Sequence, residues 1–455
     1  MMHVARVAHI AAPAEATAGH LVDPQAPGAT EIADPRRAAR YRGALAVVLF
    51  LCVTAAIGYR TASRLNVPGA PHSGNAGLQD FRDTFYYPVV SFLEGNNPYD
   101  PSSHVRTYPV GNTFPLYLPL SLILHLPFGL LPFTTAELVY FLVTAALMPL
   151  LAYLTLRLCR HGVSIGSVFG LASLMLLSRP GDWNLFLGQC AATMAIATYA
   201  ALYFRGRRSW AAAVGVAVAS MKPTYGIPLA VLMLAKREVR TVLVGVLIAA
   251  VISMGATVIL VHNAGGFAGF LASLGASQLD FGADPQVNPA TSSYRIDSVA
   301  FVARFLGHPL GLMQELGVLI GILGASALGV SRLERVQEGG APLLSASLIC
   351  VAVITCTYHQ TYDLLLLALP LTAVAMRRCP LPTSGNAGIR LLLLAALAVP
   401  AFNYLVSDSG LRHVGSSNAW WLAVTSLNGG ALILALLLYL GLALRFARLH
   451  PAPSR

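Results

Sequence analysis

Two aspartates, Asp80 and Asp83, lie in a polar stretch that begins at Gln79 and ends at Asp100. A carboxylate beside aromatic rings and close to a membrane is partly desolvated, which makes it a stronger base toward a hydroxyl proton. Either aspartate could therefore act as a general base. The alternative is that both are solvated loop acids, paired with Arg82 or Arg106.

Three further segments carry polar side chains that could bind a substrate. Lys222 precedes a proline inside an apolar run. An ionisable group within a membrane usually marks a functional site, although its ammonium could instead reach the membrane surface. His359, in the polar segment 357–363, could hold a phosphate oxygen or orient a sugar hydroxyl, or could be structural. Arg179 could grip an anionic head group, and Gln189 follows it at the start of an apolar run.

Several catalytic motifs are absent from the sequence. We find no phosphate-binding GxxxxGK[ST] loop, no HExxH, no GxSxG and no Cys/His metal spacing. A DxD pair that would hold a sugar nucleotide through a metal is also missing. These absences argue against an ATP-driven pump, a zinc protease and a serine hydrolase, and the sequence indicates neither a cofactor nor a metal site.

The composition indicates a multi-pass membrane protein. Of the 455 residues, 56% are apolar and only 11% are charged, whereas soluble proteins have about 25% charged residues. The net charge of +11 comes from arginines in short segments at the ends of apolar runs, as membrane orientation requires, so it does not indicate nucleic-acid binding. The six cysteines show no CxxC spacing and are expected to be buried thiols.

The arginine clusters predict how the chain crosses the membrane. Residues 1–35 are expected to be a disordered cytoplasmic tail, and residues 36–450 a single transmembrane domain. Four arginines between 36 and 42 place the N-terminus inside, so loop 60–114 is outside and both termini of this plasma-membrane protein are cytoplasmic. The run 209–235 has basic clusters on both sides and Lys222-Pro223 at its centre, which predicts a re-entrant hairpin or two short spans. About ten full spans are expected, at 43–59, 134–156, 162–178, 189–204, 238–262, 309–331, 342–357, 362–376, 389–406 and 418–444.

The acidic residues test this topology, because ten of the 19 fall outside or at the outer face. A secondary transporter or lipid flippase, with Lys222 at its gate, should instead place polar residues at the midplane from both halves. A non-catalytic scaffold is a further alternative, and it predicts that alanine at both Asp80 and Asp83 leaves function intact.

The order of these motifs resembles that of a known enzyme family. Asp80-Phe81-Arg82, Tyr86-Tyr87 and the segment 95–100, then Tyr108-Pro109 and a proline-rich segment, are similar to the outer loop of GT-C membrane glycosyltransferases of family GT87. Gly188-Gln189, Lys222-Pro223 and His359 to Asp363 extend the resemblance over roughly residues 40–380. The family includes mycobacterial mannosyltransferases acting on phosphatidylinositol mannosides.

The resemblance implies an all-α GT-C fold and an inverting transfer outside the cytoplasm, from a polyprenyl-phosphate sugar to a cell-envelope glycolipid or polysaccharide. Mannose is the expected sugar, and an arabinofuranosyltransferase using polyprenyl-phosphate arabinose is the alternative. Asp80 or Asp83 would be the base, since each matches part of the family pattern. The residues expected to bind the donor phosphate or sugar are Arg82, Arg179, Gln189, Lys222, His359, Tyr362 and Asp363. Those expected at the acceptor or in its loop are Tyr86, Tyr87, Asn97 and Tyr99.

Overall fold

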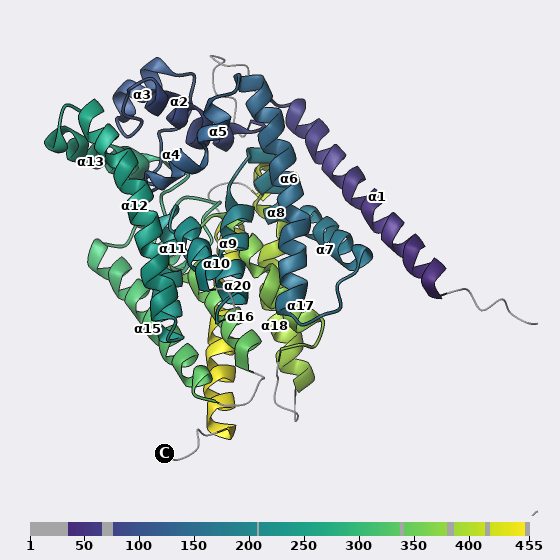
Figure 1. The fold of residues 1–455 in the computed structure, drawn as a ribbon. Helices are drawn as coiled ribbons and strands as arrows, with labels where there is room; N and C mark the ends of the chain where they lie inside the picture. The colour runs from purple at the N-terminus through teal and green to yellow at the C-terminus, as the bar shows by residue number, and fades with distance from the viewer. Residues whose placement is uncertain are drawn as a thin grey trace, which may run out of the picture. The chain divides into compact units, whose positions relative to one another are not determined.

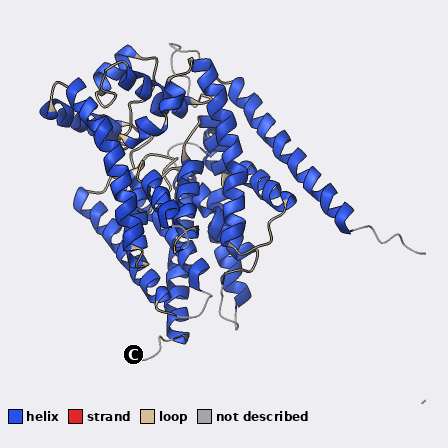
Figure 2. Ribbon diagram, viewed as in Figure 1, coloured by secondary structure: helices blue, strands red, loops and turns tan. Residues whose placement is uncertain are grey.

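The computed structural model describes residues 35–65, 76–206, 209–336, 341–379, 386–414 and 419–450. These residues form helices joined by loops, with no strand among them (Figure 2). The chain divides into two compact units, residues 1–41 and 42–455, and the second contains the core and the cavities. The tail expected at 1–35 lies outside the described residues except for its last position.

Short loops or turns connect most of the successive helices (Figure 1). The elements η1, η2 and η3 are short π or 3₁₀ turns, and the others are α-helices. In order they are α1 Pro35–Ala62, η1 Phe81–Tyr86, α2 Tyr87–Leu93, α3 Pro101–Thr107, α4 Leu120–Leu124, α5 Leu126–Gly129, α6 Phe133–Leu158, α7 Ile165–Leu177, α8 Arg179–Leu187, α9 Ala191–Tyr203, α10 Ser209–Ala219, α11 Pro223–Ala235, α12 Val239–Asn263, α13 Phe267–Ala283, α14 Ser298–Leu306, α15 Leu312–Glu334, α16 Ala341–Cys356, η2 Thr361–Leu367, α17 Ala368–Ala375, α18 Asn386–Phe402, η3 Tyr404–Val406, α19 Asp408–Val414 and α20 Ala419–Leu449.

Six of the described helices are long and apolar enough to cross a membrane, and a seventh span is counted if α8 and α9, which meet at a bend of 119°, form one broken span. The six are α1, α6, α12, α15, α18 and α20. This finding confirms the prediction of an all-helical protein with several membrane spans. Helices also occupy the other expected spans, but each is shorter than 18 residues. The count of ten full spans therefore stays a prediction.

The apolar run 209–235 is divided into α10 and α11 by a short turn at Ser220–Lys222. Pro223 is the first residue of α11, where its missing N–H costs no helical hydrogen bond. The break leaves Lys222 with an extended backbone ahead of the helix. The lysine side chain can thus leave the helix axis and reach a polar neighbour.

The core is built around α16 and α9, which carry small or apolar residues on all sides. The described side chains of α16 from Leu344 to Cys356 are buried. Glycines allow close packing beside α9: a Cβ at Gly215 in α10 would lie 2.5 Å from the Ala197 carbonyl oxygen of α9. Gly245 brings α12 equally close to α10.

The short helices α2 to α5 and α13 gather at one end of the second unit (Figure 1). The proline-rich segment 114–132 contains α4 and α5, which are separated at His125. We call this group of short helices the cap. It covers the ends of α9 and α11 at which Gln189 and Lys222 lie.

Candidate active site

A cavity of about 910 Å³ lies between the cap and the N-terminal ends of α9 and α11. Its walls come from residues 76–86, which we call the first loop, from the segment after α3, from α13 and the loop after it, and from the turn between α16 and η2. The polar residues that line it are Asp80, Thr84, Asn112, Thr113, Tyr117, Gln189, Lys222, Thr224, Gln278, Asp280, Asp284, Gln286, Tyr358, Gln360 and Tyr362. Residues from widely separated parts of the sequence thus meet at one site.

Asp80 lines this cavity and accepts a hydrogen bond from Gln189 Nε2 at 2.8 Å. Burial raises the pKa of Asp80 from its usual 3.8 to about 7, while the Gln189 hydrogen bond and the Lys222 charge oppose that rise. A carboxylate with a pKa near neutrality is suited to accepting a proton during a reaction.

The position of Asp80 depends on a close contact between two segments. Leu78 N donates to Phe186 O at 2.7 Å, which fastens the first loop to α8. Gly188 ends α8 with φ of 72°, and a Cβ there would lie 2.7 Å from Phe81 Cβ. Only glycine fits this geometry without strain, and the turn places Gln189 beside Asp80.

Aromatic rings hold the other side of the first loop. Phe81 stacks on Tyr140 of α6 with centroids 4.3 Å apart. Phe85 stacks on His125, also at 4.3 Å. These contacts bury η1 completely and join it to α6 and to the break between α4 and α5. The loop is therefore a packed element that can hold a carboxylate in one place.

Asp83 is fully buried and does not line the cavity. Its Oδ1 pairs with Arg82 Nε at 2.7 Å, and its Oδ2 accepts from the backbone N–H groups of Gly111 and Asn112, each at 3.1 Å. Burial raises the pKa of Asp83, and Arg82 opposes that rise. The carboxylate fixes the 111–112 turn, which forms one cavity wall.

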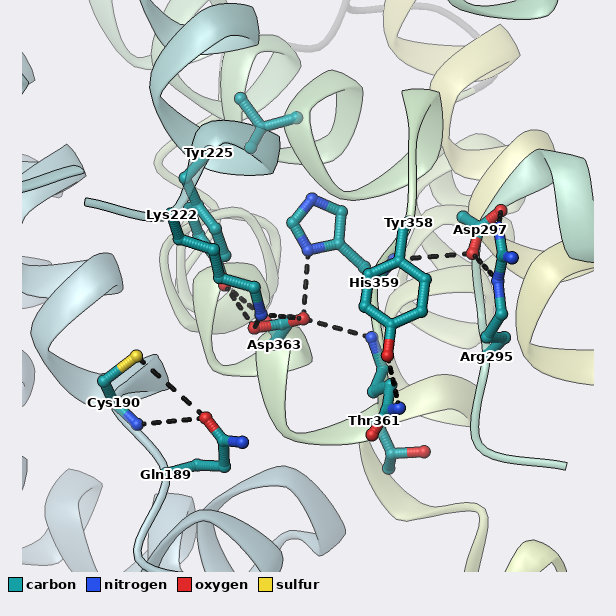
Figure 3. A network of polar contacts seen from close by, with 12 residues as sticks. Gln189, Cys190, Lys222, Tyr225, Arg295, Asp297, Tyr358, His359, Thr361 and Asp363 are labelled. Atoms are coloured by element: carbon teal, nitrogen blue, oxygen red, sulfur yellow. Dashed lines mark hydrogen bonds and ion pairs between the residues drawn. The ribbon is translucent and has the colours of Figure 1, made fainter. Parts of the chain in front are cut away.

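Lys222 also lines the cavity, and a buried carboxylate holds it (Figure 3). Lys222 Nζ lies 2.9 Å from both carboxylate oxygens of Asp363. His359 Nδ1 lies 3.0 Å from Asp363 Oδ2, and the Tyr225 hydroxyl donates to Oδ1 at 3.1 Å. Asp363 and His359 are fully buried and do not line the cavity, whereas Lys222 does.

A second ion pair, drawn in Figure 3, braces the turn after α16. Arg295 binds both oxygens of Asp297 at 2.9 Å. Backbone bonds from Ile296 N to His359 O and from Thr361 N to Tyr294 O join the loop before α14 to this turn. The contacts hold Tyr358, Gln360 and Tyr362 at the cavity wall.

The remaining candidates lie away from the cavity lining. Arg179 is buried and donates to Val406 O at 3.1 Å. The Tyr86 hydroxyl donates to Leu131 O, and the Tyr87 ring stacks on Phe133. Asn97 accepts from Tyr99 N, whose hydroxyl donates to Tyr117 O. None of these side chains lines the cavity, although Tyr99 braces the cavity residue Tyr117 from behind.

Several lining residues were not singled out from the sequence. Thr84 lies close to Asp80 in the polar stretch 79–100, whereas Asn112 and Tyr117 are isolated polar residues that only the fold brings to the same cavity. Tyr358 and Gln360 lie in the polar segment already noted at 357–363. Among the described residues, no group of three or more His, Cys, Asp or Glu side chains could hold a metal ion.

Comparison with known proteins gives one match. A model of glycosyltransferase family 87 matches residues 116–358, which is more than half of the 455-residue chain. The matched segment contains Gln189 and Lys222, whereas Asp80 precedes it and Asp363 follows it. No curated protein and no solved structure matches the chain.

Proposed function

Because this chain belongs to glycosyltransferase family 87, we propose that it transfers mannose from a polyprenyl-phosphate donor to a hydroxyl group of a cell-envelope lipid or glycan. The transfer inverts the anomeric carbon and occurs at the extracytoplasmic face of the plasma membrane. The observation that carries the proposal is that Asp80 and Lys222 line one cavity at the ends of α9 and α11. A base and a cation are the two groups that such a transfer requires.

In the proposed reaction Asp80 is the general base. Its carboxylate accepts the proton of the acceptor hydroxyl, and the resulting oxygen attacks the anomeric carbon from the side opposite the phosphate. A new glycosidic C–O bond forms as the bond to the phosphate oxygen breaks, and the bonding electrons leave with the polyprenyl phosphate. Phosphate is a good leaving group, so no general acid is needed.

Lys222 is the group that receives the donor phosphate. Its ammonium stabilises the negative charge that grows on the leaving phosphate. Asp363 and His359 act as positioning residues, because they contact Lys222 or each other and lie behind the cavity wall. The Tyr225 and Tyr362 rings lie 5.5 and 5.2 Å from Lys222 Nζ, which further restricts the ammonium.

The isoprenoid chain is proposed to leave the cavity over its apolar side. Pro115 and Leu116 lead from the cavity into the segment of α4 and α5, where the helices are short and interrupted. Such an arrangement keeps a lipid tail in the bilayer and its sugar within reach of Asp80.

The test is a transfer assay with purified protein, labelled polyprenyl-phosphate mannose and envelope lipids as acceptors. We expect Asp80→Asn to lower kcat by about 100-fold or more, because a positioned base contributes at least that factor. Asp83→Asn is the matched control: it removes a carboxylate three positions away that does not line the cavity. Because asparagine keeps a side-chain oxygen that can accept from the Gly111 and Asn112 N–H groups, the folded fraction of this control should retain transfer.

Three outcomes of the assay change the proposal. Full transfer by Asp80→Asn would remove the base and the mechanism with it. Transfer of arabinose but not of mannose would keep the mechanism and replace the sugar. Movement of intact donor across a liposome membrane without transfer would indicate a flippase.

A further inference from the structure

A second cavity lies at the opposite ends of α9 and α11 from Gln189 and Lys222. Its volume is about 230 Å³. Four cations line it, each from a different part of the chain: Arg160 follows α6, Arg205 follows α9, Lys236 ends α11 and Arg378 follows α17. We call these four residues and their cavity the basic pocket. Its apolar wall comes from Leu158, Cys159, Leu202, Pro342, Leu343 and Ala346.

The basic pocket holds more positive charge than the described carboxylates around it neutralise. Glu334 accepts from Lys236 Nζ and lies 2.9 Å from Arg205 Nη1, so one acid serves two cations. Lys236 Nζ also donates to Ser345 Oγ at 2.7 Å. The guanidinium groups of Arg160 and Arg378 make no hydrogen bond or ion pair with any residue that the structure describes. No described acid lines the pocket itself.

The basic pocket is separate from the candidate active site. Both α9 and α11 contain 13 residues and rise about 20 Å from one cavity to the other. No residue lines both cavities. The two sites can therefore be changed independently.

Membrane orientation alone does not require this arrangement. Orientation needs basic residues in the loops of one face, and Arg237 and Arg377 already supply charge there without lining the cavity. Burying Lys236, of which 5% is exposed, against an apolar wall with two unpaired guanidinium groups nearby carries an electrostatic cost. An anion bound among the four cations would offset that cost.

We propose that the basic pocket binds a phosphate group, which in the membrane is supplied by the headgroup of an anionic phospholipid. The two unpaired guanidinium groups offer planar pairs of N–H donors, which match phosphate oxygens. Basic pockets between membrane helices are suited to such headgroups, because the acyl chains stay in the bilayer while the phosphate enters the protein. Free phosphate shares this chemistry and is the second source to be tested.

The experiment uses the full-length protein in detergent, with the thermal transition followed as ligand is added. Phosphatidylglycerol, phosphatidylcholine and inorganic phosphate are titrated separately, and retained lipid is measured by native mass spectrometry. Phosphatidylglycerol should raise Tm of the wild type and remain bound. Arg160→Gln/Arg378→Gln should bind it at least about tenfold more weakly, a difference of about 1.4 kcal/mol.

The matched control is Arg237→Gln/Arg377→Gln. It removes two charges beside the basic pocket, including the direct neighbour of Arg378, but none that lines it. Retention of phosphatidylglycerol by this control, with loss in the pocket variant, supports the proposal. Equal retention in the wild type and the pocket variant, or equal loss in both variants, would overturn it.

Two further measurements identify the ligand and distinguish loss of lipid binding from loss of sugar transfer. If inorganic phosphate alone protects the wild type as well as phosphatidylglycerol does, and the pocket variant loses that protection, the ligand is free phosphate. Sugar transfer is assayed in parallel in detergent without anionic lipid. Arg160→Gln/Arg378→Gln should transfer at the wild-type rate there, so lost lipid binding cannot be mistaken for a damaged active site.

Discussion

In the proposed mechanism, the reaction depends most directly on the side chain of Asp80. Because burial raises its pKa to about 7, the carboxylate is protonated below that pH and cannot accept a proton. We expect kcat/KM to fall tenfold per pH unit below about 7 and to level off above it. A pH–rate profile of the wild type measures this. A profile that stays level down to pH 5 would exclude Asp80 as the base.

The same pKa predicts an effect on stability. Between the usual pKa of 3.8 and about 7 the folded state binds a proton at Asp80 that the unfolded state has released, so stability falls as the pH rises through this window. Asp80→Asn removes the ionisable group. Its Tm should exceed that of the wild type by more at pH 8 than at pH 5. Tm differences that do not change with pH would contradict the proposed shift.

Lys222 and Asp363 form a buried pair whose structural and functional contributions can be separated. Lys222→Met leaves the Asp363 carboxylate buried without its cation, which we expect to cost about 3–5 kcal/mol in the free energy of unfolding. Lys222→Met/Asp363→Asn is neutral and should recover most of that stability. Transfer should stay low in both variants, as a phosphate-binding role for Lys222 requires. Recovered activity in the double variant would make Lys222 purely structural.

Several of the cavity residues could be predicted from the sequence because they are polar residues beside or within apolar runs. Asp80, Gln189, Lys222 and Tyr362 all line the cavity. The sequence could not distinguish Asp80 from Asp83 as the base, because both lie in the same polar stretch. Only the fold shows that the Asp83 carboxylate is already bonded to Arg82 and to the backbone of the 111–112 turn. Pairings such as Lys222 with Asp363 join residues 141 positions apart and have no local signature.

At the scale of the elements, Gly188 decides whether the first loop can reach α8. Gly188→Ala would place a Cβ against Phe81 and also hold alanine at positive φ, so we expect a loss of stability of about 2 kcal/mol or more together with reduced transfer. Gly206→Ala is the control, because its φ is 68° but nothing lies within 4 Å. The change in Tm of Gly206→Ala therefore measures only the cost of placing alanine at a positive φ. Equal Tm values for the two variants would mean that the contact with Phe81 is unimportant.

A second pair of glycines tests the packing of α12 on α10. A Cβ at Gly245 would lie 2.7 Å from both Ala213 O and Val216 Cβ, whereas at Gly255 of the same helix nothing lies within 4 Å. Gly245→Ala should therefore destabilise the protein by about 1–3 kcal/mol, and Gly255→Ala should be neutral or slightly stabilising. Thermal unfolding in detergent compares the two variants. A neutral Gly245→Ala would show that α12 packs loosely.

The helices themselves were more predictable than their lengths. Apolar runs bounded by arginines located α6, α12, α15 and α20, since a membrane span leaves a long continuous signal. The expected spans at 162–178 and 189–204 are occupied by α7 and α9, each of 13 residues, and the connection expected between them contains a helix, α8, that meets α9 at a bend of 119°. The bend depends on the left-handed glycine at 188, whose tertiary contact with Phe81 no local pattern reveals.

For the whole molecule, the proposed topology places the active-site cavity and the basic pocket on opposite sides of the membrane. Cysteine introduced at exposed Ser102 of the cap should react in intact cells with a thiol reagent that cannot cross the membrane. Cysteine at exposed Arg237 should react only after the membrane is opened. Both substitutions are made in a Cys52→Ser background, because Cys52 is exposed. The reverse labelling pattern would invert the topology and place transfer in the cytoplasm.

The walls of the cavity come from distant parts of the sequence, so they are synthesised at different times. The ribosome delivers Asp80 long before Tyr358, Gln360 and Tyr362, which form the far wall of the same cavity. A nascent chain that has emerged only as far as α15 carries the proposed base but lacks that wall and the carboxylate that pairs with Lys222. The proposed mechanism therefore requires translation of most of the polypeptide before any transfer, and it predicts that prematurely terminated products are inactive.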